Sequence, residues 1–125
     1  MGRAFVFGDN IDTDLLAPGH AMKLEPREMA RFCLEAVDPQ FASVVRRGDI
    51  VVAGANFGMG SSREQAAISL KLLGVAAVFA QSFARIFYRN AINIGLPALV
   101  LPEAGEIAAG DEIGFDLEQG RADNR

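Results

Sequence analysis

Short apolar runs alternate with segments of helical character along the chain. Five runs rich in β-branched and aromatic residues predict strands, and these are Arg3–Phe7, Asp49–Ala55, Val75–Ala80, Ala98–Pro102 and Asp111–Leu117. The segment Glu25–Val37 has apolar residues at spacings of three and four, and it predicts an amphipathic helix. Two more helices are predicted at Ser61–Gly74 and Ser82–Gly95, because each segment opens with serine and closes at glycine.

The order of these elements predicts an α/β fold. Strands that alternate with helices favour right-handed crossovers and a partly parallel sheet flanked by helices. The chain has 125 residues, of which 50% are hydrophobic and 22% charged, a balance typical of one globular unit. We therefore expect residues 1–125 to form a single domain.

Charge and hydropathy exclude several classes of partner. The net charge is −4 and like charges do not cluster, so we expect no nucleic-acid partner. No apolar run approaches the ~20 residues that cross a bilayer. The first ten residues lack the pattern of a signal peptide. These features predict a cytoplasmic protein without a membrane contact.

Cysteine and histidine are too few for a metal site. The sequence has one cysteine, Cys33, and one histidine, His20. A single cysteine makes no internal disulfide, and the pair falls short of the common Cys/His metal patterns. We expect no metal ligands in this chain, so that any metal would need ligands from another chain.

The stretch GANFGMGSSREQA, Gly54–Ala66, leads from a predicted buried strand into a predicted helix. One interpretation is local, because Ser61 and Glu64 have the spacing of a capping box. It does not explain why Gly58 and Gly60 occur together, since one glycine suffices for a turn.

A second interpretation of the same stretch is a carboxylate site. Backbone N–H groups at a helix N-terminus favour an anion, and the guanidinium of Arg63 matches a carboxylate. The Walker A pattern and the third glycine of a dinucleotide-binding loop are both missing, so nucleotide binding is not favoured.

The stretch GDNIDTDLLAPGH, Gly8–His20, places three aspartates after the first predicted strand. Asp9 and Asn10 are typical of Asx-turns in a surface loop. Asp14 follows Thr13, and this pair is suited to orient a basic or hydroxyl group beside apolar residues that contact a ligand.

A third stretch, SFARIFYRNAINIGLP, places Arg85 and Arg89 one helical turn apart. Two arginines on one helix face are either solvated or paired with acids, or they face a partner or a carboxylate. Spacing alone does not separate these alternatives.

Together the three stretches, in this order, resemble the small subunits of isopropylmalate dehydratases (isopropylmalate isomerases) of the aconitase superfamily. The resemblance spans nearly the whole chain, and its core is Gly-x-Gly-Ser-Ser-Arg-Glu at Gly58–Glu64. It implies a swivelling β/β/α domain that closes over a large subunit carrying a [4Fe-4S] cluster. It further implies a hydro-lyase of leucine and branched-chain amino acid biosynthesis, active on a hydroxy-diacid only as a heterodimer with that subunit, with no cofactor bound by this chain.

The resemblance also implies roles for individual residues. Ser61 would be the base that removes a proton from substrate, and Asp14 a supporting catalytic acid. Ser62 and Arg63 would hold a substrate carboxylate. The full set of residues that we expect to bind substrate is Ser62, Arg63, Gly60, Leu15, Leu16 and His20.

Departures from the family pattern concern the substrate. Met59 and Gln65 stand where cysteine and histidine are usual. The specificity loop, commonly Pro-x-Arg-Tyr-Leu, is Pro18–Met22 here, with His20 in place of the arginine. The pocket is therefore also compatible with homoaconitate, dimethylmalate or a methylated malate.

Two unrelated functions are also considered. A Ser-His-Asp hydrolase is disfavoured, because Ser61 lacks the Gly-x-Ser-x-Gly elbow and nothing in the sequence brings His20 to it. A non-catalytic carboxylate-binding module would use the same Gly-Ser-Ser-Arg segment. Such a module would bind carboxylates tightly as an isolated chain.

Overall fold

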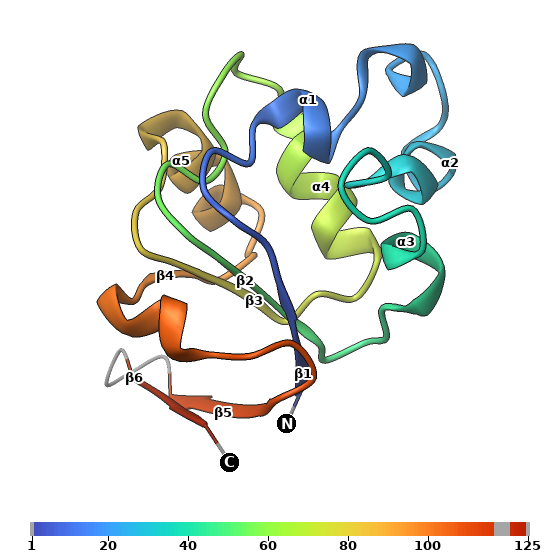
Figure 1. The fold of residues 1–125 in the computed structure, drawn as a ribbon. Helices are drawn as coiled ribbons and strands as arrows, with labels where there is room; N and C mark the ends of the chain where they lie inside the picture. The colour runs from blue at the N-terminus through green and yellow to red at the C-terminus, as the bar shows by residue number, and fades with distance from the viewer. Residues whose placement is uncertain (1, 117–120, 125) are drawn as a thin grey trace.

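A computed structural model describes residues 2–116 and 121–124. Within these residues six strands form one sheet in the order β4-β3-β2-β1-β5-β6 (Figure 1). The strands are β1 (Gly2–Val6), β2 (Ile50–Ala53), β3 (Ala77–Ala80), β4 (Ala98–Val100), β5 (Glu112–Asp116) and β6 (Arg121–Asn124). β1 to β4 are parallel, whereas β5 is antiparallel to β1 and to β6. The partly parallel sheet and its five predicted strands are confirmed, although Leu117, at the end of the fifth, lies outside the described residues. The strand β6 was not predicted, because its sequence Arg-Ala-Asp-Asn has no apolar pattern.

Helical segments connect the strands. The α-helices are α1 (Thr13–Leu16), α2 (Pro26–Met29), α3 (Phe41–Val44), α4 (Glu64–Leu72) and α5 (Arg85–Asn93). The 3₁₀ turns are η1 (Gly19–Ala21), η2 (Ala30–Phe32) and η3 (Pro102–Glu106). α4 and α5 end before Gly74 (φ 91°) and Gly95 (φ 79°), as predicted. In the described part of the chain no helix has the length and hydropathy to cross a bilayer.

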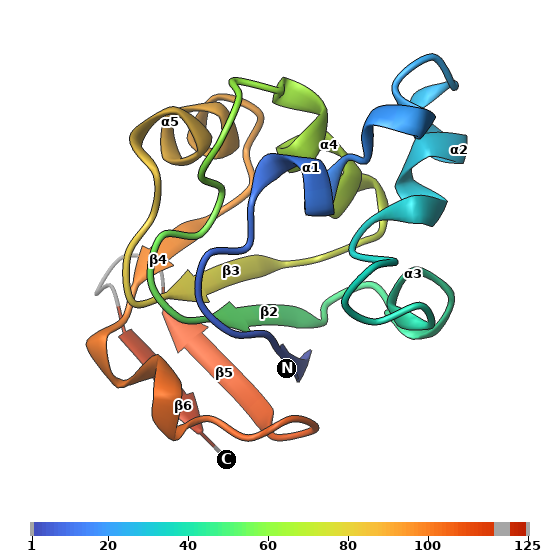
Figure 2. The same cartoon turned by 45° about the horizontal axis from the view of Figure 1, so that its top comes forward.

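The sheet separates two apolar layers. All five α-helices lie on one side, where side chains such as Val51 and Val78 of the sheet are fully buried (Figures 1 and 2). On the other side Ile50 and Phe79 pack with Ile113 of β5 and with η3. The sheet thus curls back on itself, so that β5 covers the face of the sheet opposite the helices. This confirms the expected β/β/α layering.

The predicted helix Glu25–Val37 is wrong as one continuous helix. It consists of α2 and η2, and the chain then turns at Leu34, whose φ is +61°. The N–H of Leu34 donates to the carbonyl of Leu15 at 2.8 Å, so a contact with the distant α1 replaces the next helical hydrogen bond. The apolar spacing still reports burial, but tertiary structure decides the backbone.

Serine does not cap the two longer helices, contrary to the prediction. α4 and α5 have Arg63 and Ala84 at their N-caps, and neither side chain makes a capping hydrogen bond. The hydroxyl of Ser82 instead accepts the N–H of Asn56 at 2.9 Å. Ser61 and Ser82 therefore lie in the segments that lead out of the sheet, before the helices begin.

Gly58 is required by the packing of α5, and its replacement is expected to destabilise the fold. Its φ is +83°, and a Cβ there would lie 2.3 Å from Cβ and Cγ of Phe87. Left-handed backbone and overpacking together are expected to cost Gly58→Ala about 2–5 kcal/mol in the free energy of unfolding. Urea unfolding measures this loss.

The matched control is Gly110→Ala. Gly110 has a similar φ of +88°, but a Cβ there meets nothing within 4 Å. This variant should lose only the backbone part, about 1–2 kcal/mol. Equal losses in the two variants would show that the contact with Phe87 is relieved at little cost.

Candidate active site

Two segments leave the carboxyl ends of β1 and β2 and run side by side toward the helical layer, as Figure 2 shows. Their backbones exchange hydrogen bonds in the manner of a parallel ladder. The bonds are Gly54 N to Gly8 O (3.1 Å), Asn10 N to Ala55 O (2.8 Å), Gly58 N to Ile11 O (2.7 Å) and Thr13 N to Met59 O (2.8 Å). Residues 8–13 and 54–59 are therefore paired through their backbones beyond the ends of the two strands.

Asp9 and Asn10 belong to this pairing, not to local Asx-turns. Oδ1 of Asp9 accepts the N–H of Ala55 at 2.7 Å. Oδ1 of Asn10 accepts from the side-chain amide of Asn56 at 3.0 Å, and both asparagines have positive φ. These polar side chains fix the second segment against the first.

The pairing brings two hydroxyl groups together. Oγ1 of Thr13, at the start of α1, lies 3.3 Å from Oγ of Ser61. Thr13 is buried and Ser61 is exposed. Gly60, with φ +105°, allows this approach, because a Cβ there would lie 3.1 Å from Oγ1 of Thr13. Ser61 thus presents an accessible hydroxyl with one fixed neighbour.

Free backbone donors lie next to Ser61 along the chain. The N–H groups of residues 60–63 make no hydrogen bond with any described residue, and α4 begins directly after them. Ser61 does not cap α4, so its hydroxyl is not committed to the N–H groups of the first turn. Free donors and the positive end of the helix dipole favour a negatively charged ligand, or an anionic serine oxygen, at this point.

Arg63 joins the two segments through its side chain. Its Nη1 donates to Oδ1 of Asp14 at 2.8 Å and to the carbonyl of Ala17 at 2.9 Å. Its Nε and Nη2 have no acceptor among the described residues, so part of the guanidinium stays free for a ligand. The predicted use of Thr13–Asp14 to orient a basic or a hydroxyl group agrees with these contacts.

Asp14 is an ionised acceptor in this arrangement. The hydrogen bond from Arg63 and the N–H of Gly19, at 3.1 Å, together lower the pKa of the Asp14 carboxyl below its ordinary value. Its side chain is 66% exposed, so solvent weakens the effect of the ion pair. Asp14 therefore positions Arg63 as a carboxylate.

A pH-dependent loss of stability is expected for Asp14→Asn. A lowered folded-state pKa stabilises the protein above the unfolded pKa of about 3.9, and this contribution disappears as pH falls through the folded value. The variant should have a Tm lower by at most a few degrees at pH 7, and the difference should shrink as the pH falls below the unfolded value of about 3.9. An Asp14→Asn deficit that persists in acid would contradict the ion-pair account.

The two leucines that were predicted to contact substrate differ in burial. Leu16 is fully buried in the core and has no surface for a ligand, which corrects that assignment. Leu15 is half-buried beside the same core and keeps a partly exposed side chain. Of the two leucines, only Leu15 is available to a substrate.

His20 has a partner of its own. Its Nε2 lies 2.6 Å from Oε2 of Glu35, and its ring meets Phe32 edge to face at 5.1 Å. The side chain is 59% exposed. Glu35 was not predicted as a site residue. It lies in the segment predicted as the helix Glu25–Val37, and no sequence motif marks it.

Ser62 lies exposed between Ser61 and Arg63, as the motif requires. Arg85 and Arg89 of α5 are also exposed, and neither forms an ion pair with a described residue. This removes pairing with a described acid from the alternatives for the two arginines. Solvation, a partner or a carboxylate ligand remains.

Metal-ligating side chains do not gather in the described part of the chain. No three His, Cys, Asp or Glu residues there come close enough to hold a metal ion. Cys33 is fully buried, and burial raises the pKa of its thiol far above the ordinary value. Cys33 is therefore a core residue and no exposed thiolate ligand.

Comparisons with known proteins agree with the geometry. Residues 10–104 match the family described as the aconitase C-terminal domain. The chain is 58% identical over 120 residues to a 3-isopropylmalate dehydratase small subunit of Nautilia profundicola, covering 95% of this chain and 72% of that protein. It is 54% identical over 121 residues to a 2,3-dimethylmalate dehydratase small subunit of Eubacterium barkeri, covering 95% and 74%. A crystal structure of 3-isopropylmalate dehydratase from Methanocaldococcus jannaschii superposes with a TM-score of 0.89 at 43% identity, covering 99% of this chain and 81% of that one.

Proposed function

This chain belongs to the aconitase C-terminal domain family, among the small subunits of 3-isopropylmalate dehydratases, and on that premise we propose that it forms half of the active site of a hydro-lyase. The reaction is the reversible dehydration and rehydration of a hydroxy-diacid such as isopropylmalate, a step of leucine biosynthesis. The observation that carries the proposal is the exposed Ser61 hydroxyl, held beside Thr13 in a stretch, residues 60–63, whose N–H groups have no acceptor among the described residues.

Ser61 acts as the base. Its oxygen, as the alkoxide, takes the proton from the carbon next to a substrate carboxylate while the hydroxyl leaves the neighbouring carbon, and a carbon–carbon double bond forms between them. Readdition of water with the hydroxyl on the other carbon completes the isomerisation. An alkoxide needs strong stabilisation, which the N–H groups of residues 60–63 and the end of α4 supply in a fixed arrangement.

Ser62, Arg63 and the backbone of Gly60 hold a substrate carboxylate. The free Nε and Nη2 of Arg63 face this task while Nη1 is anchored by Asp14 and Ala17. Asp14 thereby acts as a positioning carboxylate, which its lowered pKa supports better than a role as a proton donor.

The substrate side group meets the other segment. Leu15 offers a partly exposed apolar surface, and His20, paired with Glu35, stands at the polar rim of the same loop. Relatives of this chain include a small subunit named for 2,3-dimethylmalate. A branched hydroxy-diacid of either type suits Leu15, and isopropylmalate is favoured by the relatives with that name.

A large subunit completes the site. The described residues offer no metal-ligating group, so the [4Fe-4S] cluster is assigned to that subunit. When bound there, the cluster supplies a Lewis acid for the leaving hydroxyl. The roles left to this chain are the base and the carboxylate contacts.

Anaerobic mixing with a cluster-bearing large subunit tests the proposal. The unsaturated acid is followed by ultraviolet absorbance, which rises on dehydration of isopropylmalate, dimethylmalate or a methylated malate and falls on hydration of homoaconitate, which is already unsaturated. Turnover that needs both chains is expected, with isopropylmalate as the best substrate. A formed complex with an intact cluster but no turnover, together with tight carboxylate binding by this chain alone, would instead favour a non-catalytic binding module.

A further inference from the structure

A third segment leaves the sheet beside the candidate active site. It follows β3, comprises residues 81–84 and leads into α5. Three backbone hydrogen bonds pair it with the segment that carries Ser61, and these are Gln81 N to Gly54 O (3.1 Å), Phe57 N to Ser82 O (3.0 Å) and Ala84 N to Phe57 O (2.9 Å). Because β1 to β4 are parallel, the three segments and the end of β4 all lie at the carboxyl edge of the sheet (Figure 2). The start of α5 is therefore continuous with the candidate active site.

A hollow at this edge has the composition of a protein-binding surface. Its volume is about 390 Å³, and it is lined by Ser82, Phe83, Arg85, Tyr88 and Val100. Val100 is 53% exposed, Tyr88 is 41% exposed, and Ile92, one turn further along α5, is 50% exposed. Tyrosine and arginine are enriched at protein interfaces and supply much of the binding energy there. Grouped exposed apolar side chains of this kind favour a protein partner.

The ring of Tyr88 is held in place before a partner binds. Its centroid lies 5.7 Å from that of Phe83, and Phe83 stacks on Phe87 with ring planes 5° apart. Phe87 is buried against the backbone of Gly58. An aromatic side chain that is already ordered loses little conformational entropy on binding.

Arg85 and Arg89 make the same surface positive. Both side chains are exposed, and neither forms a hydrogen bond or an ion pair with a described residue. None of the residues that line the hollow is acidic. The net charge of the whole chain is −4, so this positive charge is a local feature. It is complementary to carboxylates on a partner.

A partner that closes over Ser61 has to cover more than the candidate active site. A stable interface buries about 800 Å² on each partner, which extends well beyond the few side chains around Ser61. The nearest exposed apolar group on the segments paired with it is the one on α5 and β4. We call its members the α5 surface, and they are Arg85, Tyr88, Arg89, Ile92 and Val100.

We propose that the cluster-bearing large subunit docks on the α5 surface. An apolar side chain of that subunit sits between Tyr88 and Val100, and its carboxylates pair with Arg85 and Arg89. The inference rests on the function proposed above, since that function requires a large subunit over Ser61. It adds the place where the subunit is held.

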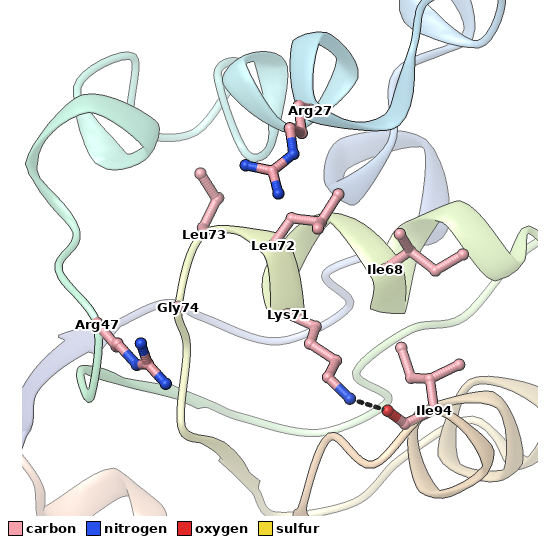
Figure 3. A pocket seen from close by; sticks show the side chains of 8 residues that line it. All are labelled: Arg27, Arg47, Ile68, Lys71, Leu72, Leu73, Gly74 and Ile94. Carbon is pink, nitrogen blue, oxygen red and sulfur yellow. Dashed lines mark hydrogen bonds between the residues drawn. The ribbon is translucent and has the colours of Figure 1, made fainter.

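The opposite end of α4 lies outside this surface and provides a matched control. The hollow there, of about 450 Å³, is lined by Arg27, Arg47 and Leu73 among others (Figure 3). Arg47 precedes β2 and Leu73 precedes β3, so this hollow lies toward the amino edge of the sheet. Arg27 and Arg47 lie on different sides of the end of α4 in Figure 3. Both are exposed and form no ion pair with a described residue, as is true of Arg85 and Arg89.

Anaerobic isothermal titration with the cluster-bearing large subunit tests the charge. The double variant Arg85→Gln, Arg89→Gln should raise the Kd of the complex about tenfold or more. The difference from the wild type should shrink at about 0.5 M salt, because salt screens exposed charges. The control Arg27→Gln, Arg47→Gln makes the same change of charge and should keep the wild-type Kd.

Two further variants test the apolar contact in the same experiment. Tyr88→Ala should raise the Kd about tenfold or more, as is usual for a central interface tyrosine. Val100→Thr keeps the shape of the side chain and should raise the Kd about fivefold, because it places a hydroxyl in an apolar contact. Val44→Thr makes the same change on α3, at a valine that is 42% exposed, and should leave the Kd unchanged. Thermal unfolding shows that each variant is folded.

The outcomes separate this inference from the proposed function. Wild-type turnover together with an unchanged Kd in the arginine double variant and in Val100→Thr would overturn the docking surface alone. Dimerisation of the isolated chain, seen by sedimentation and abolished by Val100→Thr, would also overturn it and assign the surface to a second copy. A wild-type complex that forms without turnover, yet is weakened by these variants, would support the docking surface and contradict the proposed function.

Discussion

Replacing Ser61 with alanine is expected to lower kcat on the order of 1,000-fold or more in the complex with the large subunit, because it removes the base. The fold should be unaffected. Ser61 is exposed, and its hydroxyl contacts only Oγ1 of Thr13 among the described side chains. Its Tm should stay within about 2 °C of the wild type, as is usual for a surface substitution. Steady-state kinetics and thermal unfolding on the same preparation measure both effects.

Ser62→Ala is the matched control. It removes the adjacent exposed hydroxyl from the same loop, which we assign to carboxylate binding. It should raise KM while leaving most of kcat, since uniform binding and transition-state stabilisation separate in this way. If Ser61→Ala retained kcat and Ser62→Ala lost it, the base would be Ser62.

A substitution of Thr13 tests how the Ser61 hydroxyl is oriented. Its hydroxyl is the fixed neighbour of Ser61, and Thr13→Val keeps its shape while removing that contact. A lower kcat with an unchanged KM would mean that Thr13 orients the Ser61 oxygen. The valine leaves no buried group unpaired, because the exposed Ser61 can turn to water.

The layered fold follows from sequence patterns that depend on burial. Ile50–Ala53 and Ala77–Ala80 are buried at every position, and such short apolar runs predict central parallel strands. Gly74 and Gly95 likewise predict where two helices end, because their positive φ values are cheap only for glycine. These features are encoded locally.

Other features depend on contacts between distant segments, which no local pattern contains. The N–H of Leu34 binds the carbonyl of Leu15, and this contact interrupts a segment with helical spacing. Ser61 contacts Thr13, 48 residues away, instead of capping α4. The same sequence fits a capping box and a site that leaves N–H groups free. The capping interpretation of Ser61 therefore followed from the sequence, but it is wrong.

The site residues show the same division. Arg63 and Asp14 were both selected from the sequence, yet the hydrogen bond between them appears only when their loops run side by side. Leu16 was selected with Leu15 because both are apolar, but the turn of α1 buries Leu16 and leaves only Leu15 partly exposed. Residue type predicted the chemistry of this loop, and the helix phase decided which leucine can reach a ligand.

Arg63→Lys is expected to lower kcat/KM on the order of 100-fold. The guanidinium serves three directions at once, since Nη1 binds Asp14 and Ala17 while Nε and Nη2 stay free for a carboxylate. An ammonium group is a single point and cannot keep both protein contacts and form a paired contact with substrate. The loss should appear mainly as a raised KM, with a smaller fall in kcat because the substrate is held less firmly over Ser61.

Asp14→Asn separates the two functions of Arg63 and decides the interpretation. Removing the carboxylate frees Nη1 but leaves the guanidinium intact, so the substrate contact persists with poorer orientation. Asp14→Asn should therefore lower kcat/KM by about tenfold, which is a smaller loss than that expected for Arg63→Lys. A larger loss in Asp14→Asn would assign the proton-donor role to Asp14 itself, and unchanged kinetics in Arg63→Lys would mean that Arg63 only ties the two loops together.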